Sequence, residues 1–331
     1  MSSAVGYPNI ALIKYWGKRD ERLRLPMNSS LSMTLDIFPT TTTVEADPDL
    51  TADTVTVAGV PAPPGFARRV TQFLDMVREH AGDPCPARVD TVPTGPVGAG
   101  LASSASGFAA LAAAAADAYG LDYDARRLSR LARLGSGSAA RSIFGGFVQW
   151  HCGSGIGRAA DESSYAEPVD AAGLDPAMVV VVLDAGTKHI DSATAMRRTV
   201  ETSPLYPAWS AAAAADLRQM LAAFAAGDLA RVGEIAECNA LGMHATMLAA
   251  RPSIRYLSPD SLRVLDAVDR LRHNGLPAYA TMDAGPNVKV WCHRGDAERV
   301  AAELGRVAAS AAPIVAGPGP DVRLITAVRT G

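Results

Sequence analysis

A glycine- and serine-rich segment at residues 93–107 constrains the fold of this chain more than any other feature. It reads PTGPVGAGLASSASG and lies between an expected strand at residues 88–92 and an expected alanine-rich helix at residues 106–119. Glycines let the backbone turn several amides toward one point, and the helix adds the positive end of its dipole there. The segment therefore predicts a polyphosphate site. Taken alone, it is also compatible with a helix-capping loop, and it lacks the Gly-Lys-Ser/Thr ending of a Walker A loop.

Composition and charge exclude several classes of protein. The chain has 331 residues, of which 48% are hydrophobic and 20% charged, which excludes a disordered chain and allows one large or two medium domains. Its 31 Lys and Arg against 34 Asp and Glu give a net charge of −3. That balance argues against a nucleic-acid partner bound through bulk positive charge. The four cysteines are far apart in sequence, which argues against a disulfide scaffold or a zinc knuckle.

The apolar stretches are too short to cross a membrane. The longest lie at residues 108–116 and 178–183, whereas a spanning helix needs about 20 residues. The first 13 residues lack a basic region followed by a long apolar segment, so we expect no signal peptide. We therefore expect a soluble, cytoplasmic protein without a membrane partner.

The order of the expected elements favours an α+β fold. Strands and helices mix without a steady βαβ alternation, and residues 153–176 are expected to form a loop. We place a domain boundary there, with an N-terminal α+β domain at 1–176 that carries the phosphate loop and a C-terminal α+β domain at 177–331. The remaining expected strands lie at residues 40–44, 54–57, 147–151, 178–183, 278–282, 287–293 and 322–328. The remaining expected helices lie at residues 66–80, 124–134, 208–226, 229–249, 261–274 and 297–309.

A second segment, NIALIKYWGK at residues 9–18, carries two lysines beside aromatic rings. Lysines near aromatic residues are usually solvated chains that lie over a ring. Here the apolar run at residues 10–13 directs Lys14 toward the interior, where an unpaired charge is costly. A bound anion would compensate that charge.

The third segment, GSGSAARSIFGG, occupies residues 135–146. Ser136 and Ser138 precede an expected helix start, and Arg141 follows Ser138 by three residues, so a helix would place Ser138 and Arg141 on one face. Hydroxyls, free amides and a guanidinium suit a carboxylate or a phosphate. A capped helix with a surface arginine is the alternative.

The fourth segment, TMDAGPN at residues 281–287, places Asp283 between an expected strand and a turn. An aspartate in that position caps the turn by default. Its chemistry therefore depends on what the other three segments bring near it.

Taken in chain order, at residues 9–18, 93–107, 135–146 and 281–287, the four segments resemble the diphosphomevalonate decarboxylase family. This family belongs to the superfamily of galactokinase, homoserine kinase, mevalonate kinase and phosphomevalonate kinase. The resemblance runs from residue 8 to about residue 290. It implies a two-domain small-molecule-kinase fold with the active site in the cleft between the domains, and a homodimer. It also implies a reaction in which mevalonate 5-diphosphate and ATP, with Mg²⁺, give isopentenyl diphosphate, ADP, phosphate and carbon dioxide.

The resemblance also implies roles for individual residues. Asp283 would contact the substrate's tertiary 3-hydroxyl and assist its phosphorylation, Arg141 would hold the substrate carboxylate, and Lys14 would lie deep in the catalytic site. The implied substrate-binding residues are Tyr15, Lys18, Ser136, Ser138, Arg141 and Ser192. The implied ATP-binding residues are Gly100, Leu101, Ala102, Ser103, Ser104 and Ser106, with Ser104 also a metal ligand.

Two departures from the family pattern leave alternatives open. The loop at residues 95–99 is about three residues longer than usual. Ala193 stands where many bacterial members carry an arginine, so either Arg197 or Arg198 supplies that charge or the second phosphate is bound less tightly. The alternatives are a decarboxylase of mevalonate 5-phosphate, a 3-hydroxyl kinase that does not decarboxylate, and a non-catalytic nucleotide-binding protein. Lys14, Lys18, Arg141 and Asp283 are all present, which favours the diphosphate decarboxylase.

Overall fold

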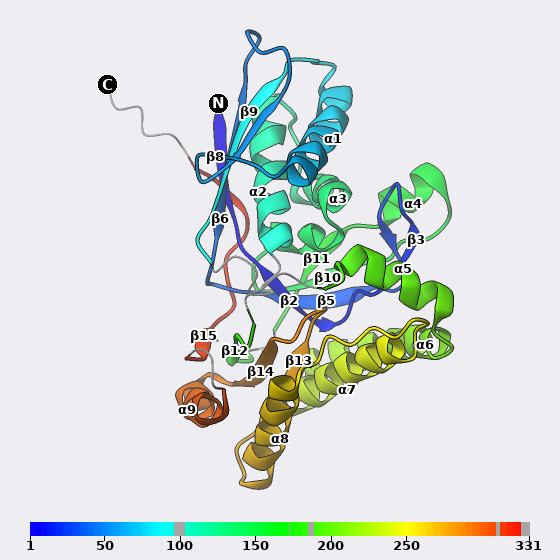
Figure 1. Ribbon diagram of the computed structural model, residues 1–331, viewed down its shortest axis with the longest axis vertical. Coiled ribbons are helices and arrows are strands. Elements are labelled where there is room, and N and C mark those ends of the chain that lie inside the picture. The colour runs from blue at the N-terminus through cyan, green and yellow to red at the C-terminus, as the bar shows by residue number, and fades with distance from the viewer. Residues whose placement is uncertain (96–102, 172, 185–188, 309–311, 326–331) are drawn as a thin grey trace.

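The computed structural model describes residues 1–95, 103–171, 173–184, 189–308 and 312–325 (Figure 1). In this part of the chain, mixed sheets and helices form the α+β architecture that the sequence predicts. Figure 1 shows the N-terminal sheet and its helices at the top, a smaller sheet across the middle, and the C-terminal sheet with its helices below.

The N-terminal sheet is covered on one face by three helices of the described chain. These are α1 (Pro64–Ala81), α2 (Ser103–Ala118) and α3 (Ala125–Gly135). Helix α2 is rich in alanine and buried along most of its length between the sheet and the other two helices, because small side chains permit close approach on every side. The strands lie in the order β16 (Arg323–Ile325), β1 (Ser2–Gly6), β6 (Thr40–Ala46), β9 (Ala87–Pro93), β7 (Thr54–Val57) and β8 (Val60–Pro61).

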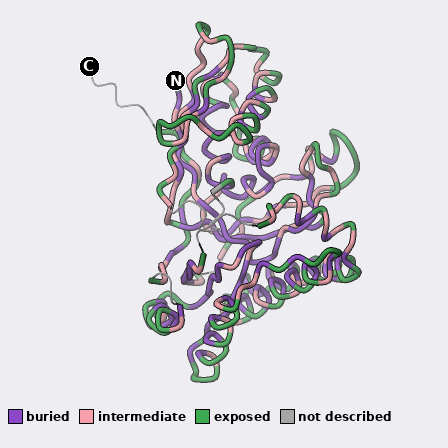
Figure 2. Tube along the Cα trace, viewed as in Figure 1, coloured by how far each residue is buried: buried purple, intermediate pink, exposed green. Residues whose placement is uncertain are grey.

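The middle sheet consists of β11 (Ala166–Val169), β10 (Phe147–Trp150), β5 (Ser30–Thr34) and β2 (Asn9–Ile13), in that order in the described residues. Every residue of β2 and β5 is buried. Their apolar side chains share one hydrophobic core with the C-terminal sheet and its helices. Figure 2 shows these buried segments along the centre of the molecule, so the two halves of the chain meet over a continuous core.

The C-terminal sheet lies between two layers of helices. Alternate residues of its strands face α8 (Pro259–His273) and α9 (Ala297–Val307) on one side. The others face the middle sheet, α6 (Tyr206–Ala225) and α7 (Leu229–Leu248). The described strands are all antiparallel, in the order β13 (Ala278–Met282), β14 (Val288–His293), β12 (Pro176–Val181) and β15 (Ile314–Ala316).

Shorter elements complete the described chain. They are β3 (Lys18–Asp20), β4 (Leu25–Pro26), the 3₁₀ segments η1 (Gly137–Ile143) and η2 (Arg294–Asp296), α4 (Gly157–Ser163) and α5 (Ser192–Thr202).

The structure corrects several sequence-based expectations. Residues 153–176 are not a loop, because they contain α4 and β11. Helix α5 was not expected either, and it begins where the Asp191 carboxylate accepts hydrogen bonds from the backbone amides of Ala193 and Thr194. The last expected strand, at residues 322–328, is described as β16 as far as residue 325.

A domain boundary near residue 176 stays a prediction. Strand β16, near the C-terminal end of the chain, pairs with β1 of the N-terminal sheet. The core of the middle sheet also includes Met178 and Val180 of β12 and Trp291 of β14.

The packing of α7 on β13 predicts a specific sensitivity at Gly233. A Cβ atom added there would overlap the ring of Tyr279. We expect Gly233→Ala to lower the free energy of unfolding by about 1–3 kcal/mol, because overpacking forces the ring or the helix to shift. Urea unfolding measures the change. Gly65→Ala is the control, since a Cβ at this helical glycine meets no atom within 4 Å and should not destabilise the protein. Equal stability of both variants would contradict the prediction.

Candidate active site

The candidate active site begins where β2 from one half of the chain meets the turn after β13 from the other (Figure 1). Lys14 follows β2 and Asp283 follows β13, and Lys14 Nζ lies 2.7 Å from Asp283 Oδ1. Lys14 is only 2% exposed, which confirms that its side chain points inward. Its backbone is fixed too, because its amide donates to Asn239 Oδ1 at 2.8 Å and its carbonyl accepts from Asn28 Nδ2 at 2.8 Å.

A second lysine reaches the other oxygen of the same carboxylate. Lys289 Nζ, from β14, lies 3.2 Å from Asp283 Oδ2, and Lys289 is 1% exposed. Our sequence analysis did not select Lys289. The signal was present, since Lys289 is a lone charged residue in the otherwise apolar run VKVWC.

The two ammonium groups control the protonation of Asp283. Burial alone would raise the pKa of this carboxyl, but Lys14 and Lys289 outweigh burial and hold its pKa well below the usual range. Burial lowers the pKa of Lys14 to about 8, although the attraction of Asp283 opposes that change. Burial likewise lowers the pKa of His244 to about 4, so this nearby ring is neutral at neutral pH. Asp283 therefore stays ionised, while Lys14 can lose its proton in mildly alkaline solution.

Arg141 forms the second part of the site and lies on the 3₁₀ segment η1. This segment has three residues per turn, so Ser138 and Arg141 share a face as the sequence predicts. Arg141 is 3% exposed and donates to neutral acceptors, to Asn9 Oδ1 from Nε at 3.2 Å and from Nη2 at 3.0 Å, and to Ser30 Oγ at 2.6 Å. In the described chain, no carboxylate lies within ion-pairing distance of its guanidinium.

The charges of this region do not balance among the described residues. Lys14 and Lys289 contact Asp283, and Arg141 lies close enough to interact with it electrostatically, so three cations are near one negative charge. Burial lowers the pKa of Arg141 to about 10, which still leaves it charged at neutral pH. Uncompensated buried cations are costly, so the arrangement suits a ligand that carries several negative charges.

Tyr15 follows Lys14 in the chain and lies close enough to Arg141 to interact with it electrostatically. The Tyr15 hydroxyl is buried and has no hydrogen-bond partner among the described residues. A Cβ at Gly137 would lie 2.8 Å from that hydroxyl, so the glycine keeps the space beside it open. The Tyr15 ring meets Trp150 edge to face, with centroids 4.8 Å apart. Lys18 Nζ pairs with Glu21 Oε2 at 2.6 Å.

The structure brings together three of the predicted serines. Ser136 Oγ lies 3.4 Å from Ser104 Oγ at the start of α2 and 3.5 Å from Ser138 Oγ. Hydroxyls from the phosphate loop segment and from the Arg141 segment therefore meet at one point.

Other predicted residues have different surroundings. Ser106 is buried, with its hydroxyl 2.8 Å from Thr40 Oγ1, on the side of α2 that faces β6. Ser192 begins α5, a helix that packs through Ala195 in the same apolar cluster as Trp16 and Ala284. Gly100, Leu101, Ala102 and the side chain of Ser103 lie outside the described residues.

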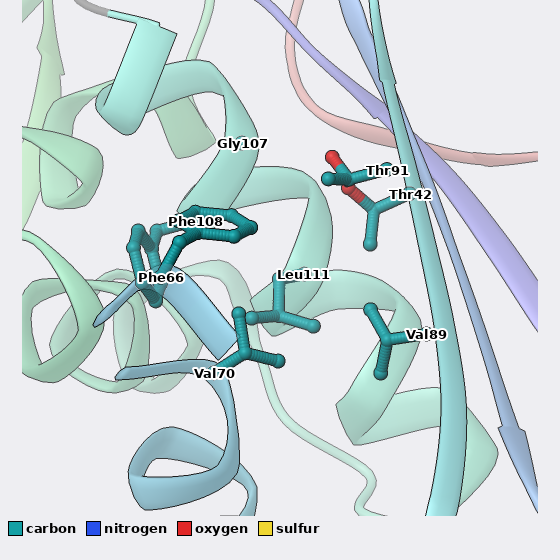
Figure 3. Close-up of a pocket in the computed structure, with 8 residues that line it drawn as sticks. All are labelled: Thr42, Phe66, Val70, Val89, Thr91, Gly107, Phe108 and Leu111. Carbon is teal, nitrogen blue, oxygen red and sulfur yellow. The ribbon is translucent and has the colours of Figure 1, made fainter. Parts of the chain in front are cut away.

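A small pocket lies between α1, α2 and the N-terminal sheet (Figure 3). None of the charged side chains described above lines it. The hydroxyls of Thr42 and Thr91 lie 3.0 Å apart, so the polar groups on its sheet side bond each other. Its lining residues are Thr42, Phe66, Val70, Val89, Thr91, Gly107, Phe108 and Leu111.

The pKa of Lys14 predicts how anion binding depends on pH. Because this pKa is lowered to about 8, Lys14 loses its charge as the pH rises through 8, and affinity for an anion should then fall by up to about tenfold per pH unit. Calorimetric titration with sulfate tests this, because the charge of sulfate is constant in this range. Lys18→Met should retain the decline, whereas Lys14→Met should bind weakly at every pH. A decline that persists in Lys14→Met would show that another group titrates.

Comparisons with known proteins agree with this geometry. Residues 6–166 match the model of the diphosphomevalonate decarboxylase-like N-terminal domain, and residues 178–315 match the mevalonate 5-diphosphate decarboxylase C-terminal domain. The chain is 39% identical to human diphosphomevalonate decarboxylase over 304 residues, which cover 86% of this chain and 74% of the human protein.

Solved structures extend this similarity to the whole fold. A structure described as MDDEF in complex with MVAPP, AMPPCP and magnesium superposes with a TM-score of 0.92 at 44% identity, over 98% of each chain. Mevalonate diphosphate decarboxylase from Staphylococcus aureus superposes with a TM-score of 0.93 at 39% identity, also over 98% of each chain. By sequence and by fold, the chain belongs to the diphosphomevalonate decarboxylase family.

Proposed function

We propose that this protein converts mevalonate 5-diphosphate and ATP to isopentenyl diphosphate, ADP, phosphate and carbon dioxide. Family membership supports the reaction class. The observation that carries the proposal for this chain is the buried excess of positive charge at Lys14, Lys289 and Arg141 around the single carboxylate of Asp283. A substrate with a carboxylate, a diphosphate and a tertiary hydroxyl supplies the missing negative charge.

Asp283 acts in the first step, the transfer of the terminal phosphoryl group of ATP to the 3-hydroxyl. Its side chain is 29% exposed, so the carboxylate can accept a hydrogen bond from a bound hydroxyl. Its lowered pKa makes it a weak base. Phosphoryl transfer passes through a loose transition state in most analyses, so orientation of the nucleophile matters more than early removal of its proton. Asp283 orients the hydroxyl and accepts the proton as the O–P bond forms.

Arg141 acts in the second step. The phosphorylated oxygen leaves C3 as phosphate, and positive character develops at C3. The bond between C2 and the carboxylate then breaks, and its electron pair forms the alkene as carbon dioxide departs. Arg141 keeps that carboxylate ionised and in line with the leaving group, and its bonds to Asn9 and Ser30 fix the plane of the guanidinium.

Tyr15, Lys18, Ser136, Ser138 and Ser192 are proposed to bind the substrate. The loop from Gly100 through Leu101, Ala102, Ser103 and Ser104 to Ser106 is proposed to bind ATP. The family relative described with AMPPCP and magnesium supports ATP and Mg²⁺ for this chain.

A magnesium ion held largely by nucleotide phosphates fits the described residues. They contain no group of three or more His, Cys, Asp or Glu side chains that could hold a metal ion, but the exposed Ser104 offers a hydroxyl at the start of α2. Ser104 would hold the ion. When bound, Mg²⁺ neutralises charge on the phosphates.

A homodimer and a cytoplasmic location belong to the same proposal. Both rest on the family, and sedimentation in solution tests the homodimer. The described chain contains no helix that is long and apolar enough to cross a membrane.

A substrate comparison tests the proposed reaction against a decarboxylase of mevalonate 5-phosphate and a 3-hydroxyl kinase. Incubation with ATP and mevalonate, its 5-phosphate or its 5-diphosphate, with ADP and carbon dioxide measured together, separates them. ADP without carbon dioxide would identify the kinase, and turnover of the monophosphate alone would identify the other decarboxylase.

Replacement of the Asp283 carboxylate tests its role in the first step. We expect Asp283→Asn to lower kcat by about 10²–10⁴-fold, the usual contribution of a positioned acid–base group, with little change in substrate affinity. Steady-state release of ADP measures kcat, and circular dichroism checks that the variant is folded. Wild-type turnover in a folded variant would contradict the role.

Replacement of Arg141 by lysine tests whether the guanidinium aligns the substrate carboxylate. Lysine keeps the charge but loses the planar fork, so we expect carbon dioxide release to fall about ten- to a hundredfold at saturating ATP, while nucleotide affinity is unchanged. Ser30→Ala is the matched comparison, because it removes one acceptor of Arg141 but keeps the guanidinium, so carbon dioxide release should fall less than in Arg141→Lys. Decarboxylation at the wild-type rate in Arg141→Lys would show that Arg141 has only a structural role.

A further inference from the structure

Lys289 lies at a position of the C-terminal sheet where an apolar residue is expected. Strand β14 is flanked on both sides, with Lys289 opposite Thr281 of β13 and Val180 of β12. Its neighbours Val288 and Val290 face the core beneath α8 and α9, so Lys289 points to the opposite face, toward the site. An apolar side chain of similar length would carry no desolvation penalty here, and replacement of a buried ion pair by apolar residues is often neutral or stabilising. Stability alone therefore does not account for a lysine.

The contacts of Lys289 lie inside the protein. Its Nζ faces Asp283 Oδ2 at 3.2 Å and the Asn287 carbonyl oxygen at 3.4 Å, and the residue is 1% exposed. Asp283 is the partner that reaches the surface, since 29% of its side chain is exposed. Beyond the general attraction of its charge for an anion, Lys289 can therefore act on the substrate by contact only through the Asp283 carboxylate.

We propose that Lys289 is a positioning residue for Asp283, whose ammonium holds the second carboxylate oxygen so that the group stays ionised and keeps one orientation toward the 3-hydroxyl. This inference rests on the proposed function. Lys14 holds Oδ1 at 2.7 Å and Lys289 holds Oδ2 at 3.2 Å, so the carboxylate cannot rotate without breaking one of the two contacts. Without Lys289 the carboxylate would have a single charged anchor.

The other groups that face Asp283 allow the contribution of Lys289 to be separated. Lys14 comes from the end of β2, Arg141 from η1, and His244 of α7 shares a hydrogen bond with the backbone of Asp283. His244 is neutral above about pH 4, so it adds no charge at neutral pH. Burial raises the pKa of Asp283 and each lysine lowers it. Loss of Lys289 must therefore raise this pKa.

The first test measures Asp283 itself, without turnover. Carbon-13 NMR of labelled aspartate carboxyls, with the Asp283 signal assigned from its loss in Asp283→Asn, follows ionisation as the pH is lowered. We expect the Asp283 signal to titrate at higher pH in Lys289→Met than in the wild type. Lys289→Gln replaces the methionine variant if that variant does not fold. An unchanged Asp283 titration would overturn the proposal, whatever reaction the protein catalyses.

The second test measures turnover. We expect Lys289→Met to lower kcat about tenfold with little change in KM, because a misplaced catalytic group loses rate rather than binding. The acid limb of its pH–rate profile should lie at higher pH than in the wild type, and Lys289→Arg should restore it in part. Val290→Ala, on the opposite face of the same strand, is the control for a general loss of packing and should leave the profile unchanged.

A double-mutant cycle shows whether the effect passes through Asp283. In the Asp283→Asn background, Lys289→Met should change the residual kcat by less than about twofold, because residues that act as a unit are not additive. An equal effect in both backgrounds would overturn the proposal. If the wild type does not turn over mevalonate 5-diphosphate, the proposed function fails, and the NMR titration still decides the role of Lys289.

Discussion

The ion pair between Lys14 and Asp283 is the interaction on which the rest of the site depends. It joins residues from opposite halves of the chain and lies over the core that the middle and C-terminal sheets share. Two asparagines hold the Lys14 peptide, and Asn239 in turn donates to Asp216 Oδ2 at 2.9 Å. Removal of one partner from a buried pair costs about 3–5 kcal/mol in many proteins, because the other charge remains desolvated. The packing of the two halves and the ionisation of the site therefore depend on the same ion pair.

The hydrogen-bond partners of Arg141 explain how the site retains positive charge. Arg141 is oriented by an amide oxygen and a hydroxyl, which fix the guanidinium without neutralising it. A carboxylate in place of Asn9 or Ser30 would orient the guanidinium equally well, but it would compete with an anionic substrate for that charge. By contrast, Asp283 is placed between two cations, so the one negative group of this cluster is itself strongly held.

Local sequence patterns predicted the motifs of this site better than its framework. The inward direction of Lys14 followed from the apolar run before it, and the shared face of Ser138 and Arg141 followed from their spacing. The spacing did not predict that η1 is a 3₁₀ helix, because a spacing of three residues places side chains on one face of both a 3₁₀ helix and an α-helix.

The missed elements have physical causes as well. Helix α5 has the sequence SATAMRRTVET, whose β-branched residues have low helix propensity, and its start depends on the Asp191 cap. Strand β2 is not among the expected strands, although the unbroken apolar run before Lys14 fits a strand buried on both faces. The meeting of Lys289 with Asp283 depends on strand register and on the turn between β13 and β14, which no local pattern specifies.

The buried cations also bear on how this protein could be engineered. Cations that repel one another lower the stability of the fold, as is common where stability is exchanged for activity. Apolar residues at such positions would tend to raise the melting temperature. A screen that selected for heat resistance alone would therefore enrich variants with fewer charges at the site. The most heat-resistant of these variants would have low turnover. Selection for thermostability should accordingly be run with turnover as a joint criterion.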